Sequence, residues 1–282
     1  MIRPSIIVHG GCGRVDESSI PERRDGVLEA AEAGWRLLKE GGSSVDAVEA
    51  AVMVLEDIPL FNAGRGSVLN SDGVVETDAA IMEGASLSAG AVAGLSGFLN
   101  PINIARRVMD KSPHVLLICQ GAERFALREG FRQSEAGQLA VDYRRQEWER
   151  EHGTVGAVAC DRQGHLAAAT STGGSKNKLP GRVGDSPLIG AGTYANSQIA
   201  VSCTGDGENI MRMTLSRLAA FLYREYEDAE TAITAALRDL EATLGGEVGL
   251  IGVDCRGRSG FTKNSPHMPV FAIEDGEVSI YC

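Results

Sequence analysis

Two neighbouring stretches decide the fold: Gly-Thr-Val-Gly-Ala-Val-Ala at residues 153–159 and Leu-Ala-Ala-Ala-Thr-Ser-Thr at residues 166–172. Each contains an apolar run of strand length, and a short segment with a turn signal at Gly164 separates them. This pattern predicts a β-hairpin. Its first strand starts at Thr154 and its second ends near Thr172, so we expect the two hydroxyls to meet at one edge of the sheet.

Thr154 has a side chain that can become a nucleophile. A threonine hydroxyl reacts poorly until a base lies beside it, and an N-terminal threonine can use its own α-amine, whose pKa is about 7.7–8.0. Thr154 is mid-chain, so its nitrogen stays an amide until the Gly153–Thr154 bond is cut. The sequence thus suggests a precursor that breaks its own backbone. Taken alone, however, Thr154 is also a plain strand former and Thr172 a plain turn residue.

Glycine-rich blocks elsewhere in the chain accompany this hairpin. They are His-Gly-Gly-Cys-Gly at 9–13, Leu-Phe-Asn-Ala-Gly-Arg-Gly-Ser at 60–67 with Glu-Thr-Asp-Ala-Ala-Ile-Met at 76–82, Gly-Arg-Val-Gly-Asp-Ser-Pro at 181–187, and Cys-Thr-Gly-Asp-Gly-Glu at 203–208. Each block is weak alone, but chance matches do not preserve order and spacing together. In this order the blocks resemble the plant-type asparaginase/isoaspartyl peptidase family of N-terminal-nucleophile hydrolases.

The pattern of helices and strands by itself allows an α+β fold with a sheet sandwich. The family resemblance sharpens this to a four-layer αββα sandwich, the N-terminal-nucleophile hydrolase fold. It implies one hydrolase domain over residues 1–282, cut by the protein itself into an α subunit, 1–153, and a β subunit, 154–282. It also implies self-association as a dimer of αβ units, a heterotetramer.

The resemblance implies an amidohydrolase that cleaves the side-chain amide of L-asparagine and the β-linked bond of isoaspartyl dipeptides, without a cofactor for catalysis. Thr154 would attack, a β-aspartyl-enzyme would form, and water would release aspartate. Two alternatives stay open. One is a glycosylasparaginase-like hydrolase, and the other is an uncleaved, non-catalytic protein that binds aspartate-type ligands.

The resemblance assigns catalytic roles to hydroxyl and backbone groups. Thr172 would orient the nucleophile, and Thr204 with the backbone amide of Gly205 would stabilise the oxyanion. Thr204 precedes a predicted helix, so capping that helix is an alternative role for it. Asn62 falls where the family places an asparagine near the nucleophile.

Arg182 and Asp185 lie three residues apart in a loop flanked by glycine and proline. The resemblance implies that the substrate's α-carboxylate binds the Arg182 fork and its α-amine binds Asp185, with a carbonyl contribution from Gly207. A fork of N–H donors suits a carboxylate. A surface ion pair of little energetic value is the alternative.

The segment 55–66 resembles the family's sodium-binding loop. Backbone carbonyls are the ligands there, so an ordinary ordered loop is equally compatible with the sequence. By position, the carbonyl ligands would belong to Leu55, Glu56, Ile58, Phe61, Ala63 and Arg65.

Composition favours an acidic globular protein. The chain has 282 residues, 43% of them hydrophobic, and a formal net charge of −11, which argues against a general nucleic-acid binder. No apolar run is long enough to span a membrane. Six scattered cysteines and an N-terminus that is typical of a first strand rather than a signal peptide point to the cytoplasm. The partners expected are therefore small substrates and a second copy of the chain.

Further elements are predicted from the spacing of apolar residues and from the capping and turn residues between them. Residues 130–151 are polar and charged and predict a linker with little core of its own. A lone histidine is more often structural than catalytic, which applies to His9 and His152. Helices are expected at 24–39, 43–55, 103–109, 121–129, 207–226 and on to 244, and strands at 1–9, 115–119, 199–203, 248–254, 269–273 and 278–281.

Two positions depart from the family pattern. Cys12 replaces the usual alanine of the opening glycine block. Asp206 lies in the oxyanion block, near the space for a leaving group, where its carboxylate would repel the second carboxylate of an isoaspartyl dipeptide. Alternatively, Asp206 points into solvent or pairs with a cation such as Arg212.

Overall fold

The computed structural model describes residues 2–134 and 153–281. The strands of this part of the chain form a large sheet and a small sheet. The large sheet has the order β12-β11-β1-β5-β6-β2-β3-β4, and the small sheet has the order β10-β9-β8-β7. The strands are β1 Ser5–His9, β2 Thr77–Glu83, β3 Ala89–Leu95, β4 Leu116–Ile118, β5 Val155–Cys160, β6 Leu166–Thr172, β7 Thr193–Ala195, β8 Ile199–Gly205, β9 Val248–Asp254, β10 Ser259–Lys263, β11 Val270–Glu274 and β12 Glu277–Tyr281.

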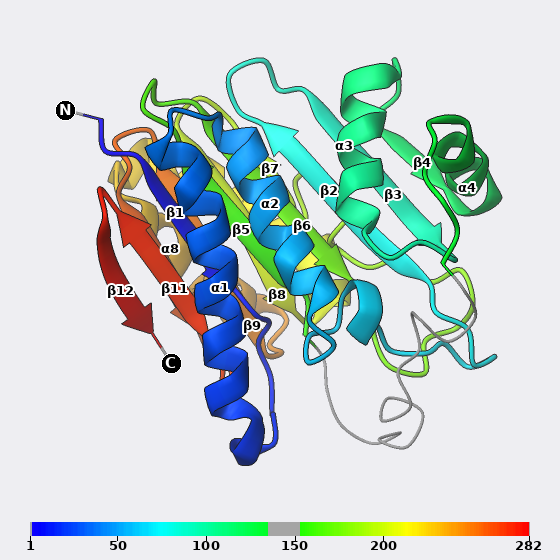
Figure 1. Cartoon of the computed structure of the whole chain (residues 1–282). Helices are drawn as coiled ribbons and strands as arrows, with labels where there is room; N and C mark the ends of the chain where they lie inside the picture. The colour runs from blue at the N-terminus through cyan, green and yellow to red at the C-terminus, as the bar shows by residue number, and fades with distance from the viewer. Residues whose placement is uncertain (1, 135–152, 282) are drawn as a thin grey trace.

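Helices cover the outer face of each sheet. On the large sheet, α1 packs on β1 and β11, α2 on β5 and β6, and α3 on β2 and β3 (Figure 1). On the small sheet, α7 and α8 pack on β8, β9 and β10. The α-helices of the described residues are α1 Ile20–Lys39, α2 Ser44–Asp57, α3 Pro101–Lys111, α4 Cys119–Arg128, α6 Gly207–Met213, α7 Leu215–Tyr226 and α8 Ala229–Thr243.

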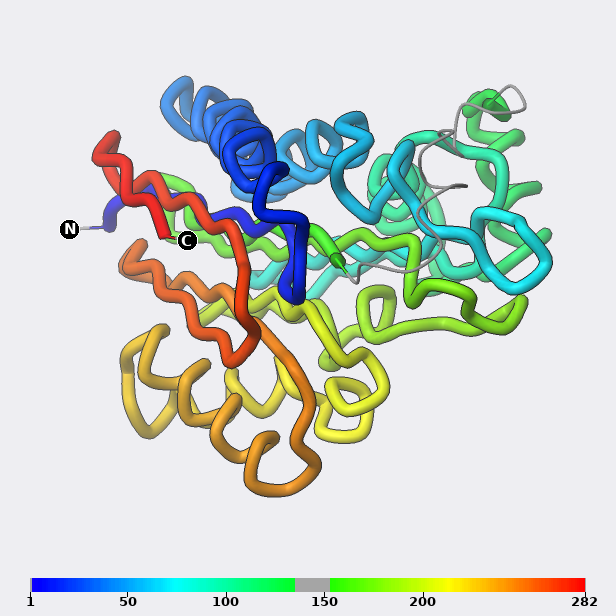
Figure 2. The backbone as a smooth tube through the Cα atoms, turned by 90° about the horizontal axis from the view of Figure 1, so that it is seen from below, coloured from blue at the N-terminus to red at the C-terminus, as the bar shows by residue number. Residues whose placement is uncertain are grey.

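The two sheets pack face to face between the helical layers. Figure 2 shows the order helix, sheet, sheet, helix from one side of the molecule to the other. Strands β5 and β6 of the large sheet contact β8 of the small sheet, and β1 contacts β9. The predicted four-layer α+β sandwich is therefore confirmed. No helix in the described residues combines the length and apolar character that crossing a membrane requires.

The predicted hairpin is the centre of the large sheet. Every residue of β5 and β6 is buried, because one face of the hairpin meets the helices and the other meets the small sheet. Ala157 and Ala169 belong to the core under the helices, whereas Val158 and Ala168 belong to the core between the sheets. Burial on both faces explains why these strands are almost continuously apolar. Small alanines also let both outer layers approach closely.

The structure corrects the sequence predictions at several places, and β7 and β10 are among the strands that were not predicted. The single helix expected over 207–226 is broken at Thr214, whose φ of 46° lies in the left-handed region, so that α6 and α7 are separate helices. The loop-rich middle of the chain contains β2 and β3, which were not predicted. Both strands are rich in alanine and glycine, which are depleted in strands.

The linker predicted over 130–151 falls mostly on residues 135–152, which lie outside the described residues. Its first residues are anchored. Phe131 packs against the core of the large sheet, and the Ser134 amide donates a 2.8 Å hydrogen bond to the Gly97 carbonyl. The start of the predicted linker is therefore wrong for Phe131 and Ser134, which contact the folded domain.

Helices α1 and α2 cross at a glycine. A Cβ on Gly34 would lie 2.7 Å from the Ala47 carbonyl oxygen and would collide with Ile6 of β1. We predict that Gly34→Ala destabilises the protein by about 1–3 kcal/mol, because overpacking outweighs the gain in helix propensity. Gly121→Ala in α4 is the control, since a Cβ there meets no atom within 4 Å; it should stabilise by about 0.5–1 kcal/mol. Equal effects in urea denaturation would contradict close packing at Gly34.

Candidate active site

Two threonine hydroxyls meet at the end of the central hairpin. The Thr154 Oγ1 donates to Thr172 Oγ1 at 3.2 Å, and Thr172 Oγ1 accepts the Gly174 amide at 2.9 Å. Both side chains are buried. The β5–β6 register, with Val155 opposite Ser171, places the two threonines at the same edge, so the geometric expectation for the hairpin is confirmed.

A third threonine reaches this point from the small sheet. Thr204, near the end of β8, donates its hydroxyl to the Thr154 carbonyl oxygen at 3.3 Å and accepts the Cys12 amide at 3.2 Å. Thr204 does not cap the following helix, which corrects the capping alternative. The α6 cap is Asp206, whose carboxylate accepts the Asn209 amide. Thr204 therefore links the large sheet, the small sheet and the opening glycine block.

The opening glycine block, residues 9–13, packs closely against the Gly153–Thr154 backbone. Gly11 has a φ of 96°, and a Cβ there would lie 2.6 Å from the Gly153 Cα and 3.1 Å from the Thr154 carbonyl oxygen. Only glycine permits this approach. Cys12 adds a second link, because its thiol donates to the Thr204 carbonyl at 3.3 Å. Burial raises the pKa of Cys12 to about 11, so this thiol stays protonated.

Arg182 and Asp185 lie close together but do not form an ion pair with each other. The guanidinium donates two hydrogen bonds to the Glu208 carboxylate, both at 2.9 Å. Asp185 is 3% exposed, and its Oδ2 has no hydrogen-bond partner within the described part of the chain. The surface-pair alternative is therefore wrong for Asp185, and Glu208 was not foreseen as the partner of Arg182.

Gly207 closes the space around these charges. A Cβ on Gly207 would lie 2.7 Å from Asp185 Oδ1 and 3.0 Å from an Arg182 terminal nitrogen. Burial raises the pKa of Asp185 to about 7, and the nearby Arg182 guanidinium only partly offsets that effect. The structure thus brings together the three residues that the sequence grouped, with one carboxylate oxygen left without a donor.

Asn62 supports the turn that follows Thr172. Its amide donates to the Gly174 carbonyl at 2.8 Å, and its Oδ1 accepts the Val68 amide at 3.0 Å. It also lies beside the candidate cleavage site, since a Cβ on Gly153 would be 3.8 Å from the Asn62 Cβ. Asn62 is therefore near the Gly153–Thr154 bond, but its side chain is hydrogen-bonded to the protein backbone.

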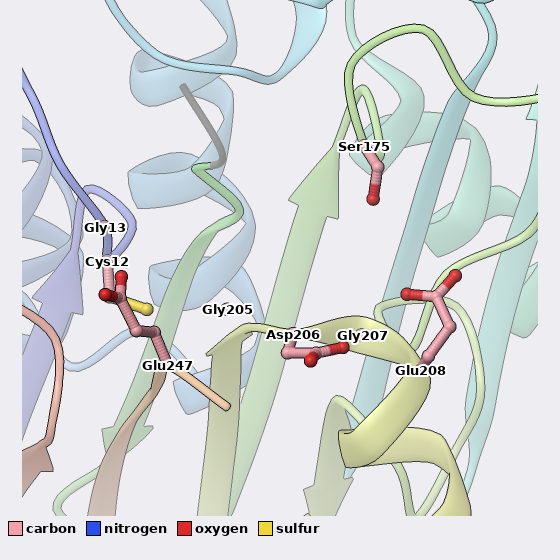
Figure 3. Close-up of a pocket in the computed structure, with 8 residues that line it drawn as sticks. All are labelled: Cys12, Gly13, Ser175, Gly205, Asp206, Gly207, Glu208 and Glu247. Atoms are coloured by element: carbon pink, nitrogen blue, oxygen red, sulfur yellow. The ribbon is translucent and has the colours of Figure 1, made fainter. Parts of the chain in front are cut away.

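A pocket of about 360 Å³ opens beside these residues. In Figure 3, Asp206 and Glu208 flank Gly207 at the start of α6, and Ser175 lies across the pocket from them. Asp206 accepts a hydrogen bond from the Asn209 side-chain amide rather than from Arg212, and Arg212 donates to Asn209 Oδ1 instead. Glu247 was not predicted from the sequence as a pocket residue. The pocket is lined by Cys12, Gly13, Ser175, Gly205, Asp206, Gly207, Glu208 and Glu247.

His9 is part of a buried hydrogen-bond chain under the hairpin. Its Nδ1 accepts the Gly11 amide at 3.2 Å, which leaves Nε2 to donate to Ser202 Oγ at 3.1 Å. Ser202 in turn bonds Thr170 at 2.8 Å. Burial lowers the pKa of His9 to about 3, so the ring stays neutral and structural. His152 lies outside the described residues.

Glycines let the backbone of the proposed sodium loop pack closely on itself. It runs from the end of α2 to the short 3-10 helix at Gly64–Gly66. A Cβ on Gly64 would collide with the Glu56 carbonyl oxygen, and one on Gly66 would collide with the Phe61 carbonyl oxygen. The described residues contain no cluster of acidic, histidine or cysteine side chains that could hold a metal. The hard carbonyl oxygens of this loop fit a sodium ion.

The buried Asp185 generates a prediction for stability. Because its carboxyl pKa is raised to about 7 in the folded protein, against 3.8 unfolded, unfolding releases a proton between these values and stability falls as pH rises through that window. Asp185→Asn cannot ionise. We expect its melting temperature to exceed that of the wild type increasingly from pH 4 to pH 7, and the difference to level off above. A difference that does not vary with pH would contradict a buried, ionising Asp185.

Comparison with known proteins agrees with this geometry. A family model described as Asparaginase matches residues 2–152 and 149–281. The chain is 47% identical to the isoaspartyl peptidase/L-asparaginase of Bos taurus, over 98% of this chain and 95% of that protein. It is 46% identical to the plant-type L-asparaginases of Pyrococcus furiosus and Thermococcus kodakarensis, over 96% of this chain and 97% of each. The chain therefore belongs to the asparaginase family, which is a family of hydrolases.

Proposed function

We propose that this protein cleaves itself between Gly153 and Thr154 and then hydrolyses the side-chain amide of L-asparagine and the β-linked bond of isoaspartyl dipeptides. One observation carries the proposal. The Thr154 hydroxyl is buried at the head of β5, 3.2 Å from Thr172 Oγ1, and its own carbonyl is held by Thr204. The names of the relatives, isoaspartyl peptidase/L-asparaginase and plant-type L-asparaginase, support this substrate class.

The self-cleavage step uses the same hydroxyl. Thr154 Oγ1 adds to the Gly153 carbonyl carbon, the C–N bond breaks, and an ester replaces the amide. Water then hydrolyses the ester, which leaves a carboxylate on Gly153 and a free amine on Thr154. The tight packing of Gly11 against Gly153 supports this step, because it restricts the backbone that must react.

In the mature enzyme the free amine is the base. It takes the proton of the Thr154 hydroxyl as the oxygen attacks the amide carbon, and it returns a proton to the leaving ammonia or amino acid. Thr172 orients the nucleophile. The Thr204 hydroxyl and the Gly205 amide stabilise the negative oxygen that forms. Water then cleaves the β-aspartyl ester to give aspartate.

Arg182 and Asp185 would select an α-amino acid. The Arg182 fork binds the α-carboxylate, in competition with Glu208, which holds that fork in the described structure. Asp185 with the Gly207 carbonyl binds the α-ammonium. The unpartnered Asp185 oxygen supports this role, because a buried carboxylate lacking donors gains most from an arriving cation.

Three further expectations belong to the same proposal. The carbonyls of the loop after α2 hold a sodium ion that stabilises the structure and takes no part in catalysis. Two αβ units associate as a heterotetramer. The enzyme works in the cytoplasm, which is supported by the absence of disulfides among the five described cysteines.

Self-cleavage distinguishes this enzyme from an uncleaved binding protein. Thr154→Ala removes the nucleophile and should remain one chain near 29.7 kDa on a denaturing gel. The wild type should give fragments 1–153 and 154–282, and N-terminal sequencing should find Thr154 first. Thr154→Ser is the matched control and should still cleave, because it keeps the hydroxyl. A new terminus at any residue other than Thr154 would refute the assignment.

Substrate assays separate the enzyme from a glycosylasparaginase-like hydrolase. The mature wild type should release ammonia from L-asparagine and leucine from isoaspartyl-leucine. Turnover of glycosyl-asparagine alone would favour the alternative. The Thr154→Ala chain should be inactive on each compound.

A further prediction concerns Asp206, which lines the pocket and caps α6. Its negative charge should raise the transition-state free energy for an isoaspartyl dipeptide by about 1–3 kcal/mol, because it repels the α-carboxylate of the leaving residue. Asparagine releases only ammonia and does not meet this repulsion. Asp206→Asn keeps the cap and removes the charge. We expect the ratio of kcat/KM for isoaspartyl-leucine to that for asparagine to rise about tenfold. Glu241→Gln, outside the pocket, should leave the ratio unchanged. An unchanged ratio in Asp206→Asn would remove Asp206 from specificity.

A further inference from the structure

Asp78 lies beside the catalytic hairpin without taking part in the chemistry. It is on β2, which runs beside β6 (Figure 1). Its register partner on β6 is Thr172, and Asp78 is fully buried. On its other side the β2–β3 pairing shifts register between Thr77 and Ala79. Two residues of β3, Ala93 and Gly94, therefore lie opposite the single residue Asp78, so Asp78 faces a β-bulge of β3, a feature that is common next to functional sites.

The carboxylate of Asp78 joins two backbone segments. Its Oδ1 accepts the Gly94 amide of β3 at 2.8 Å, and its Oδ2 accepts the Gly184 amide at 3.1 Å. Gly184 stands between Arg182 and Asp185 in the loop of residues 173–192, which we call the recognition loop. A single rigid side chain thus ties the recognition loop to the strand that pairs with Thr172.

We propose that Asp78 is a positioning residue, which fixes where Arg182 and Asp185 stand relative to the threonine nucleophile. The inference rests on the proposed function, because it assigns Asp78 to the binding of the substrate's α-amino and α-carboxylate groups. Asp78 does not touch the substrate. It acts through the Gly184 amide, one residue before Asp185.

Neighbouring contacts hold the earlier part of the recognition loop. Lys178 donates to the Glu76 carbonyl at 2.8 Å, and the Gly181 amide donates to the Glu76 carboxylate at 3.1 Å. These bonds fix the loop before Arg182, whereas the Asp78 bond fixes it after Arg182. The two sets of hydrogen bonds lie on either side of Arg182 in the recognition loop. Without the Asp78 bond, the part of the loop that carries Asp185 would be held less firmly.

Asp78 also acts on Asp185 through its charge. Buried Asp78 has a raised pKa, which the nearby Lys178, its two amide donors and Arg182 counteract. Burial is the largest cause of the raised pKa of Asp185, to which Asp78 and Glu208 add and which Arg182 opposes. Asp185 in turn helps to raise the pKa values of the Cys12 and Cys203 thiols, for which burial is the largest cause. Removing the Asp78 charge should therefore let Asp185 ionise at a lower pH.

The test is Asp78→Asn in the full-length, self-cleaved enzyme. The isosteric amide cannot accept two N–H donors, because its NH₂ group faces one of them. We expect normal self-cleavage and a kcat that changes less than threefold. The KM for asparagine should rise about tenfold or more, because a binding group displaced by about an ångström loses affinity by a factor of that order. The acidic limb of the pH profile of kcat/KM should also move to lower pH, because Asp185 then ionises at lower pH.

Asp161→Asn is the matched control. Asp161 is likewise buried and accepts the Gln163 and His165 amides, but it lies at the far turn of the hairpin. It should lower the melting temperature and leave KM and the pH profile unchanged. If Asp78→Asn gave little soluble protein, Asp78→Glu would replace it, because it keeps the charge and displaces the acceptors by one methylene.

Hydrogen exchange gives a measurement that does not depend on activity. In Asp78→Asn, peptides covering residues 182–188 should exchange faster than in the wild type, while peptides from α1 should not change. Unchanged exchange, an unchanged KM, or a raised KM without movement of the acidic limb would each overturn the proposal. Failure of the proposed function is distinguishable: wild-type enzyme would then lack asparaginase activity and Arg182→Ala would change nothing.

Discussion

The site depends on one junction, where the head of β5 meets the end of β6 and the end of β8. The Thr154 hydroxyl bonds Thr172 within the large sheet, and the Thr154 carbonyl bonds Thr204 of the small sheet. Because β5 and β6 are buried on both faces, this junction cannot move without disturbing two cores at once. A nucleophile on such strands is held more rigidly than one on a loop.

Glycines make this junction possible. The opening block reaches the Gly153–Thr154 backbone only because Gly11 lacks a side chain and adopts a positive φ. Gly205, at the end of β8, has a φ of 123° and would collide with the Glu247 carbonyl if it carried a Cβ. Backbone approach at these points brings amide groups near the reacting atoms. Ordering these glycines costs conformational entropy, which apolar burial elsewhere in the four layers offsets.

Local patterns predicted much of the fold and less of the site. The hairpin, α1, α2 and the strands β9, β11 and β12 follow from periodicity that extends over a whole element. Strands β2 and β3 were missed because their alanines and glycines carry little strand signal. The sequence paired Arg182 with Asp185 by spacing, yet Arg182 binds Glu208, 26 positions away, and Asp78 binds Gly184, 106 positions away. Such contacts arise from chain topology, which no local window contains.

The arrangement of charges explains why the site is costly to build. Asp78 and Asp185 are buried carboxylates. Asp78 accepts two amide donors, whereas residues 2–134 and 153–281 supply no donor to one oxygen of Asp185. A buried acceptor without a donor costs free energy until a ligand satisfies it. An α-ammonium group would supply the missing donors and the opposite charge together. The same desolvation that makes the buried carboxylate costly would therefore favour a cationic amino group over a neutral one in the proposed binding role, because charges interact more strongly where water is excluded.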